Sequence, residues 1–325
     1  METRTITRLG REVSVVGVGT WQLGADWGEV EEKDARAVLT AAHKEGVTFY
    51  DTADVYGDGR SERIIAGFAG KHDDVFVATK MGRRVAQSLV NYNPANFEAW
   101  NRRSRENLAT DKLDLVQLHC PPDEVYESDA VFHALDDMVD RGWIAAYGVS
   151  VETCAQALSA IERPGVATVQ IILNCFRLKP LDEVLPAARK AGVGIIARVP
   201  LASGLLSGKY DENTTFGPDD HRNFNRAGEQ FDVGETFAGV PFEVGLEAVA
   251  ELKELLNEGQ TLSEFALRWI IDQRGVSTVI PGARSKEQAK RNAAAAQAPP
   301  LTAAQLDGVK DVYRRLIAEH VHDRW

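Results

Sequence analysis

In the stretch Gly46-Val47-Thr48-Phe49-Tyr50-Asp51-Thr52-Ala53-Asp54-Val55-Tyr56-Gly57, a short apolar run ends at the carboxylate Asp51 and reaches the phenol Tyr56 five residues later. Two later runs end in the same way: residues 75–79 lead to Lys80, and residues 115–118 lead to His119. A short apolar run bounded by polar residues is typical of a buried strand. We therefore expect an acid, a phenol, an amine and an imidazole at the same end of neighbouring strands.

Eight such apolar runs occur along the chain, at residues 13–18, 48–52, 75–79, 115–118, 146–149, 168–173, 194–199 and 278–280. Segments with helical spacing of apolar residues lie between or after them, at residues 34–44, 95–108, 128–140, 181–190, 261–272 and 303–316. Strands that alternate with helices favour parallel pairing through right-handed crossovers, and eight is the number at which such a sheet closes. The sequence predicts an α/β fold of the (β/α)8 TIM-barrel class.

Two additions to the barrel are expected. Residues 5–14 alternate around Leu9-Gly10, which indicates an N-terminal β-hairpin that could plug the bottom of the barrel. Residues 207–241, after the seventh strand, are rich in Gly, Pro, Asn and Asp and carry no periodic pattern. A loop of this length is more often a functional lid than a plain connection. No Pro- or Ser-rich linker divides the chain, so we expect one domain over residues 1–325.

Composition narrows the possible partners. The chain has 325 residues, 44% hydrophobic content, a formal net charge of −11 and a pI near 5.2. An acidic protein is a poor ligand for nucleic acid or anionic lipid, although a local pocket for one anionic cofactor is compatible with this charge. Cys120, Cys154 and Cys175 show no disulfide or zinc-knuckle spacing. No signal-type or membrane-spanning apolar run is present in the sequence, so we expect a cytoplasmic protein with no membrane partner.

Two other enzyme classes fit less well. Gly17, Gly19 and Gly24 imitate a dinucleotide fingerprint, but the last glycine comes two positions too late for the G-x-G-x-x-G spacing. A metal-dependent barrel hydrolase needs His, Asp or Glu ligands at several strand ends. The single His-x-His, at His320 and His322, lies in the last six residues. We therefore expect no catalytic metal. If the protein bound a metal ion and had hydrolase activity, a metal-dependent barrel hydrolase would become the preferred class.

Taken as a set, the motifs at the strand ends resemble those of the aldo-keto reductase family. The first comprises Asp51-Thr52-Ala53, Tyr56-Gly57 and Ser61-Glu62, and later matches follow in order at residues 78–80, 117–119, 147–150, 200–209 and 280–284. The resemblance extends over nearly the whole chain. It implies reduction of an aldehyde or ketone to the alcohol, or the reverse, by direct hydride transfer from a nicotinamide cofactor. A sugar or another small carbonyl compound is a candidate substrate.

The resemblance implies four catalytic residues, and elementary chemistry explains their types. A free tyrosine, with a pKa near 10, is a poor acid at pH 7. An adjacent ammonium would favour the phenolate, and a carboxylate would hold that ammonium charged and oriented. Tyr56 is thus the general acid or base, with Lys80 and Asp51 supporting it. His119 would bind the substrate carbonyl or tune the phenol.

The resemblance also implies the cofactor and substrate sites. Ser150, Gln170 and Asn174 would hold the nicotinamide amide, although Val151 stands where relatives commonly carry asparagine. Arg198 stands where many relatives carry an aromatic residue, so either its guanidinium or another side chain stacks on the nicotinamide. Arg284 could bind a ribose 2′-phosphate, which favours NADPH over NADH. The full cofactor set is Gly19, Thr20, Trp21, Asp51, Ser150, Gln170, Asn174, Arg198, Pro200, Leu201, Ser203, Gly204, Lys209, Gly282, Arg284, Gln288 and Asn292, and the substrate candidates are Trp21, Tyr56, Met81, Trp100 and His119.

A second possible function stays open, because potassium-channel β-subunits also resemble these reductases. In that case the chain would be a cofactor-sensing partner subunit with little catalytic turnover. Fold similarity does not fix function. The sequence leaves the physiological substrate, the favoured direction and the oligomeric state undetermined.

Overall fold

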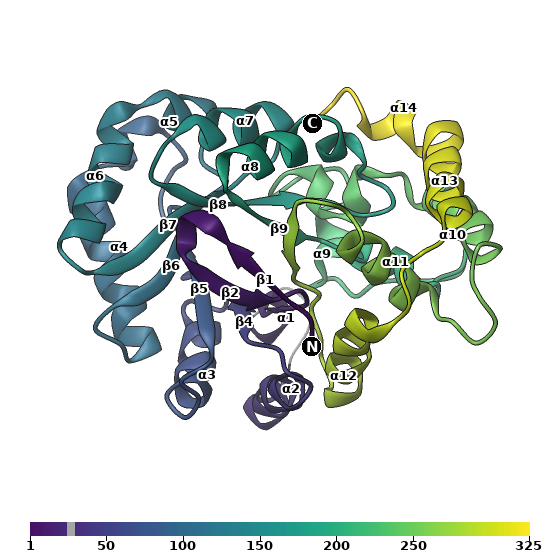
Figure 1. Cartoon of the computed structure of the whole chain (residues 1–325), viewed down its shortest axis with the longest axis horizontal. Helices are drawn as coiled ribbons and strands as arrows, with labels where there is room; N and C mark the ends of the chain where they lie inside the picture. Colours follow the sequence, from purple (N-terminus) through teal and green to yellow (C-terminus); the bar gives the residue numbers. More distant parts are fainter. Residues whose placement is uncertain (25–29) are drawn as a thin grey trace.

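The chain begins with the expected hairpin. In the computed structural model, which describes residues 1–24 and 30–325, β1 (Thr3–Ile6) pairs antiparallel with β2 (Arg11–Ser14). The 3-10 turn Thr7–Leu9 and Gly10, whose φ is +64°, connect them. Ile6 and Val13 are buried in a core cluster with Phe49, Phe76 and Leu115 from the barrel strands. The hairpin therefore closes one end of the barrel, as the purple strands across the centre of Figure 1 show.

Eight parallel strands form the central sheet, in the sequential order β3 to β10. Isolated parallel bridges between Val16 and Val279 and between Gly19 and Gly282 join the first strand region to the last. These bridges complete the barrel, and the TIM-barrel prediction is confirmed. The strands are β3 (Val18–Gly19), β4 (Phe49–Asp51), β5 (Phe76–Met81), β6 (Leu113–His119), β7 (Ile144–Ser150), β8 (Val166–Ile172), β9 (Gly194–Arg198) and β10 (Val276–Val279).

Helices surround the sheet, and α12 returns to lie beside α2, which closes the outer ring (Figure 1). Seven helices follow strands β4 to β10 around the ring, and α2 follows β3. These are α2 (Glu32–Lys44), α3 (Arg60–Ala69), α4 (Pro94–Leu108), α6 (Asp129–Asp140), α7 (Cys154–Glu162), α8 (Val184–Ala191), α11 (Leu262–Ile271) and α12 (Lys286–Ala294). Additional helices are α1 (Trp21–Gly24), α5 (Asp123–Glu127), α9 (His221–Phe224), α10 (Phe242–Lys253), α13 (Ala303–Val312) and α14 (Ala318–Val321).

Three sequence-based boundaries were wrong. The expected first strand, residues 13–18, is split, because Val13 pairs with Arg4 in the hairpin and the barrel strand begins at Val18. The residues after it were not assigned to any helix, and they contain the helical turn Trp21–Gly24. The last predicted helix ends at Val312 and continues as a π-helical turn over Tyr313–Ile317.

The long segment after β9 is folded onto the barrel. It contains α9 and the 3-10 turns Val233–Glu235 and Phe237–Gly239, and it leads into α10. Its aromatic side chains pack together: the ring centroids of Phe237 and Phe242 are 5.1 Å apart, and those of Tyr210 and Phe216 are 5.3 Å apart. These side chains connect the segment to the main hydrophobic core of the barrel.

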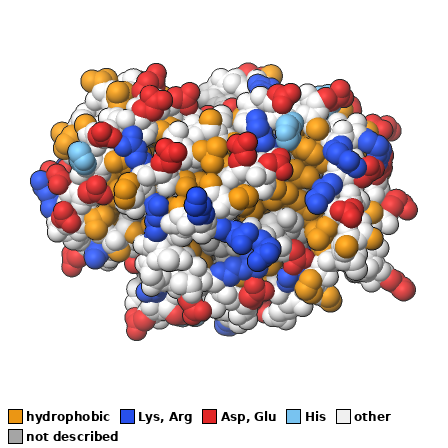
Figure 2. Space-filling view, turned by 45° about the horizontal axis from the view of Figure 1, so that its top comes forward, with side chains coloured by type: hydrophobic (Ala, Val, Ile, Leu, Met, Phe, Trp, Pro, Cys, Tyr) orange, Lys and Arg blue, Asp and Glu red, His pale blue; other side chains and the backbone are white. Residues whose placement is uncertain are grey.

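On the molecular face that Figure 2 presents, acidic and basic side chains are intermixed, and Lys and Arg side chains gather near its middle. In the described ranges, no helix combines the length and the apolar character that crossing a membrane requires.

Candidate active site

A buried ion pair lies at the centre of the site. Asp51 is the last residue of β4, and Lys80 is the fifth residue of the adjacent strand β5. The Lys80 Nζ atom lies 2.5 Å from Asp51 Oδ1 and donates to the carbonyl oxygen of Thr52 at 2.9 Å. Both side chains are buried, with 1% and 2% exposure. Burial alone would lower the pKa of Lys80, but the Asp51 carboxylate and the Tyr56 phenol together outweigh burial, and the net pKa is raised.

Two glutamine amides complete the environment of the carboxylate. Gln170 Nε2 donates to Asp51 Oδ2 at 2.8 Å, and Gln117 Nε2 donates to the same oxygen at 3.2 Å. These residues come from β8 and β6. A buried carboxylate costs less free energy when several donors satisfy it. Four strands therefore fix the position of Asp51. From the sequence, Gln170 was expected to bind the cofactor, and Gln117 was noted only as part of the motif at residues 117–119.

Tyr56 lies next to this pair, in the loop between β4 and α3. Its Oη atom is 3.4 Å from Lys80 Nζ, and Nζ lies 5.1 Å from the centre of its ring. Burial raises the pKa of the Tyr56 phenol, and the Lys80 cation opposes that rise. The phenol is thus protonated at neutral pH, with a cation beside it that would stabilise the phenolate once the proton leaves.

His119, at the end of β6, faces the same phenol. The ring centroids of Tyr56 and His119 are 5.9 Å apart with nearly perpendicular planes. Burial, followed by the nearby Arg83, Lys80 and Arg198 cations, holds the pKa of His119 well below its usual range. The imidazole is therefore neutral at pH 7 and carries one donor and one acceptor nitrogen. A carbonyl oxygen bound between the two rings could take a proton from one and a hydrogen bond from the other.

A single cavity of about 650 Å³ collects nearly all of the sequence-selected residues. It extends from Tyr56 and His119 to the first turn of α12, so its lining comes from both ends of the chain. The selected residues that line it are Gly19, Thr20, Trp21, Asp51, Tyr56, His119, Ser150, Gln170, Arg198, Pro200, Leu201, Ser203, Gly204, Lys209, Gly282, Arg284, Gln288 and Asn292.

Four selected residues do not line this cavity, and the first of them, Lys80, is the buried cation that contacts Tyr56. Met81 follows Lys80 on β5 and therefore points to the opposite side of the sheet, into the core between strands and helices. Trp100 on α4 packs against Phe97 with ring centroids 5.9 Å apart and is 6% exposed. Both are core residues, which corrects their assignment to the substrate pocket. Asn174 donates its amide to the carbonyl oxygen of Val199 and stabilises the loop after β8.

The far end of the cavity is formed by the start of α12. Ser285 Oγ accepts the Gln288 N–H at 3.2 Å, as the helix-capping pattern indicates. Gln288 Oε1 accepts a hydrogen bond from the backbone N–H of Arg284 at 2.7 Å. In a capping box it would accept from the N–H of the N-cap residue, Ser285. A Cβ atom at Gly282 would lie 1.8 Å from Gln22 Oε1, so a larger residue there would require the Gln22 side chain to move. Gln22 lines the cavity and was not identified from sequence.

A charged network that the sequence did not reveal joins the long insertion to the barrel. Glu235, in the insertion, lies 3.3 Å from Arg83 Nη2 and 3.5 Å from Arg198 Nη1. Arg83 also contacts Glu152 at 3.4 Å and donates from Nε to the carbonyl oxygen of His119 at 3.2 Å. Burial would raise the pKa of Glu235, but Arg198 and Arg83 lower it overall. These partners are far apart in sequence, so spacing could not have identified them.

The insertion also supplies an aromatic wall near the phenol. The Trp21 ring lies 6.2 Å from Tyr56, 4.9 Å from His221 and 5.8 Å from Phe231, measured between ring centroids. His221 and Phe231 belong to the insertion, so residues 207–241 contribute aromatic side chains to the surroundings of Trp21.

Known proteins share this architecture. The Aldo/keto reductase family model matches residues 15–314. The aldo-keto reductase YhdN of Bacillus subtilis (strain 168) is 32% identical over 296 residues, which cover 89% of this chain and 86% of that protein. The solved glycerol dehydrogenase AKR11B4 from Gluconobacter oxydans is 30% identical, with a TM-score of 0.79, over 98% of this chain and 96% of its own. A probable voltage-gated potassium channel subunit beta from Arabidopsis thaliana is 27% identical over 330 residues, 96% of each chain.

The chain therefore belongs to the aldo/keto reductase family.

Asp54 generates a pH-dependent prediction. Its carboxyl is fully buried in the loop between Asp51 and Tyr56, and burial, with the nearby Glu62 carboxylate, raises its pKa to about 7. The unfolded chain loses this proton near pH 4, whereas the folded chain keeps it until about pH 7. The contribution of Asp54 to the free energy of unfolding therefore falls as pH rises between these two values, by at most about 1.4 kcal/mol per pH unit.

Asp54→Asn should remove this slope. We expect the variant to gain Tm relative to wild type at pH 8 and to gain less at pH 5, as measured by thermal denaturation. Glu98→Gln, an exposed carboxyl-to-amide change on α4, serves as the matched control and should leave the pH profile unchanged. An Asp54→Asn profile parallel to that of wild type would contradict the assignment.

Proposed function

We propose that this protein reduces an aldehyde or ketone to the alcohol, or catalyses the reverse, with NADPH or NADP⁺ as hydride carrier and Tyr56 as general acid or base. The observation that carries the proposal is the contact between Tyr56 Oη and the Lys80–Asp51 pair, at 3.4 Å and 2.5 Å, in the wall of one large cavity. When bound, the nicotinamide would supply or accept the hydride.

Each protein group then has a definite task in moving the proton. Tyr56 donates its phenolic proton to the carbonyl oxygen as negative charge develops there. Lys80 stabilises the phenolate that remains, and Asp51 keeps Lys80 charged and in place. Neutral His119 donates a hydrogen bond to the same substrate oxygen. In the oxidation direction the phenolate accepts the proton from the alcohol.

The residues of the cavity fit a dinucleotide. Lys209, Arg284 and Arg291 line its outer part and would balance the charge of phosphate groups, although the whole chain is acidic. Gly282 has no side chain, so a ligand that displaced the Gln22 amide could approach the backbone closely. The first turn of α12 offers backbone N–H groups to a phosphate. We place the adenosine end of NADPH here and the nicotinamide near Ser150 and Gln170.

For the substrate we propose a small hydroxylated aldehyde or ketone. The wall beside His119 contains Arg198, Glu235 and the Ser150 hydroxyl, and such charged and polar groups can hydrogen-bond to hydroxyl groups. The similar Gluconobacter protein is a glycerol dehydrogenase, which agrees with this choice. We propose that residues 207–241 act as a lid over this end, anchored by Glu235. The cysteines Cys120, Cys154 and Cys175 are buried and free, which supports a cytoplasmic location.

A second candidate function rests on the likeness to the plant potassium channel β-subunit. In this alternative the protein binds NADPH and signals through a partner with little turnover. Purified protein should therefore be tested with NADPH against a panel of aldehydes, ketones and sugars. Turnover on the panel supports the enzyme, whereas tight NADPH binding without turnover supports the sensor.

Tyr56→Phe tests the catalytic assignment. Loss of the phenolic proton should reduce kcat by at least about 100-fold, the lower end of what general acid catalysis contributes. The Kd for NADPH, measured by fluorescence titration, should stay within about twofold of wild type because the ring is retained. Tyr147→Phe is the matched control, since its hydroxyl is bonded to Asp136 at 2.7 Å, outside the cavity. Retained turnover in Tyr56→Phe would refute the role of the phenol.

Arg284→Ala tests the cofactor preference. Arg284 lines the outer part of the cavity, and a guanidinium there would pair with the 2′-phosphate that only NADPH carries. We expect the KM for NADPH to rise about tenfold or more while that for NADH changes little, in steady-state kinetics with both cofactors. Lys290→Ala, which removes an exposed cation on the neighbouring helix α12, should change neither KM. An equal effect of Arg284→Ala on both cofactors would remove the assignment.

A further inference from the structure

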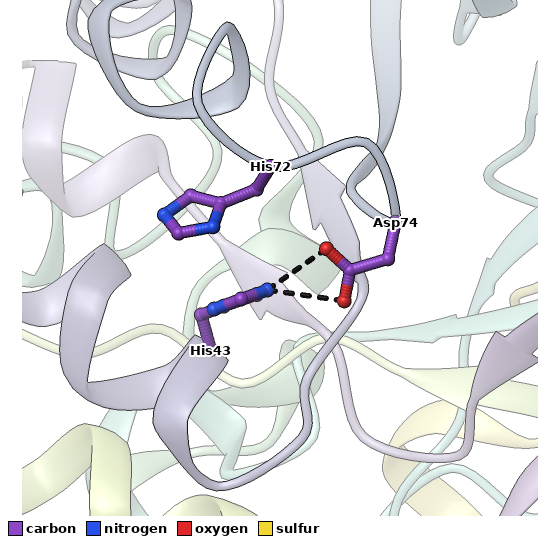
Figure 3. Close-up of side chains that lie close together, drawn as sticks. All are labelled: His43, His72 and Asp74. Carbon is purple, nitrogen blue, oxygen red and sulfur yellow. Dashed lines mark hydrogen bonds and ion pairs between the residues drawn. The ribbon is translucent and has the colours of Figure 1, made fainter.

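Two histidines and an aspartate converge far from the cavity. His43 is in the last turn of α2, and His72 and Asp74 lie in the connection between α3 and β5. One nitrogen from each imidazole and one carboxylate oxygen lie within 4.8 Å of one another. Figure 3 shows the His72 ring above the His43 ring, with the Asp74 carboxylate turned toward His43.

Ring contacts hold the two histidines, and the exposed Asp74 side chain is held by its contact with His43. His43 Nε2 lies 3.0 Å and 3.1 Å from the two Asp74 carboxylate oxygens. The two imidazole centroids are 4.1 Å apart, and both rings contact the buried Phe68 ring, at 5.7 Å and 4.8 Å. Two ligand atoms about 2.0 Å from a tetrahedral zinc ion are about 3.3 Å apart. The His43 and Asp74 atoms therefore need to move by only a few tenths of an ångström to share such an ion.

The electrostatics of this corner also favour a cation. Two neutral imidazoles and one carboxylate carry one negative charge together, which suits a divalent ion. Helices α2 and α3 both end next to the cluster, and the C-terminal end of a helix dipole attracts positive charge.

A second set of possible ligands in the described chain, Cys120, Glu152 and Glu235, is a poorer choice. Its carboxylates are already paired with arginines: Arg83 contacts Glu152 and Glu235, and Arg198 contacts Glu235. A cation there would have to displace two guanidinium groups. The His43, His72 and Asp74 cluster contains no arginine or lysine among its recorded ion pairs.

We propose that His43, His72 and Asp74 form a binding site for Zn²⁺, with water as the fourth ligand. Imidazole nitrogens and a carboxylate oxygen are the usual zinc ligands in proteins. Helix α2 leads into β4, which ends at Asp51, and the loop with His72 and Asp74 leads into β5, which carries Lys80. A bound ion would tie together the beginnings of these two strands, at the end of the barrel opposite the cavity, and would stabilise the fold without joining the reaction.

Isothermal titration calorimetry of the full chain with Zn²⁺ tests this proposal. We expect one ion per chain with a Kd below about 10 µM, and a Tm increase of roughly 4 °C when Zn²⁺ is near 100 times its Kd. His43→Ala and His72→Ala should each weaken Zn²⁺ binding by at least about 100-fold. Loss of a residue that only hydrogen-bonds to a metal ligand weakens binding by about 10- to 100-fold, so a larger loss indicates direct coordination. His133→Ala, a change of an exposed histidine on α6, should leave binding unchanged.

His320 and His322, near the C-terminus, are the alternative Zn²⁺ ligands in the same chain. If His320→Ala with His322→Ala removes Zn²⁺ binding and the His43 and His72 variants retain it, the proposed site is wrong. Absence of binding below about 1 mM Zn²⁺ would also overturn it. If either histidine variant unfolds, Asp74→Asn offers a milder change, and X-ray absorption of the zinc-loaded wild type should show two imidazole ligands. A spectrum without histidine scattering would contradict the proposal.

Discussion

The ion pair between Asp51 and Lys80 is the interaction on which the site depends. Removing two charges from water costs several kcal/mol for each ion, and their attraction repays this only when the remaining polar groups are satisfied. Here Lys80 also reaches the Thr52 carbonyl oxygen, and the carboxylate accepts from Gln117 and Gln170. These partners come from strands β4, β5, β6 and β8, so the pair exists only when the barrel has its correct register.

The same pair determines how the neighbouring groups ionise. Burial keeps Tyr56 protonated and His119 neutral, while Lys80 remains charged because Asp51 compensates it. The result is a proton donor and a neutral hydrogen-bond donor on one cavity wall, with a fixed cation behind the phenol. The insertion contributes to the same electrostatics through Glu235, which places a carboxylate between Arg83 and Arg198.

Local sequence patterns were sufficient for the fold, and the family resemblance indicated most of the residues that line the cavity. Apolar runs that end in Asp51, Lys80 and His119 located the strand ends, and a parallel barrel brings such ends together. The side on which a strand residue points was less well predicted, so Met81 was assigned to the cavity although it alternates with Lys80 and enters the core. Glu235 and Arg83 could not be predicted, because they meet only through the folded insertion, more than a hundred residues apart.

A double-mutant cycle on the buried pair tests the account most directly. The free energy of unfolding should be measured for Asp51→Asn, Lys80→Met and the double variant. Each single change leaves one buried group without its partner and should cost about 3–5 kcal/mol, whereas the double variant should lose much less than the sum. Additive losses, or single variants as stable as wild type, would show that the pair does not organise the site and would contradict the account.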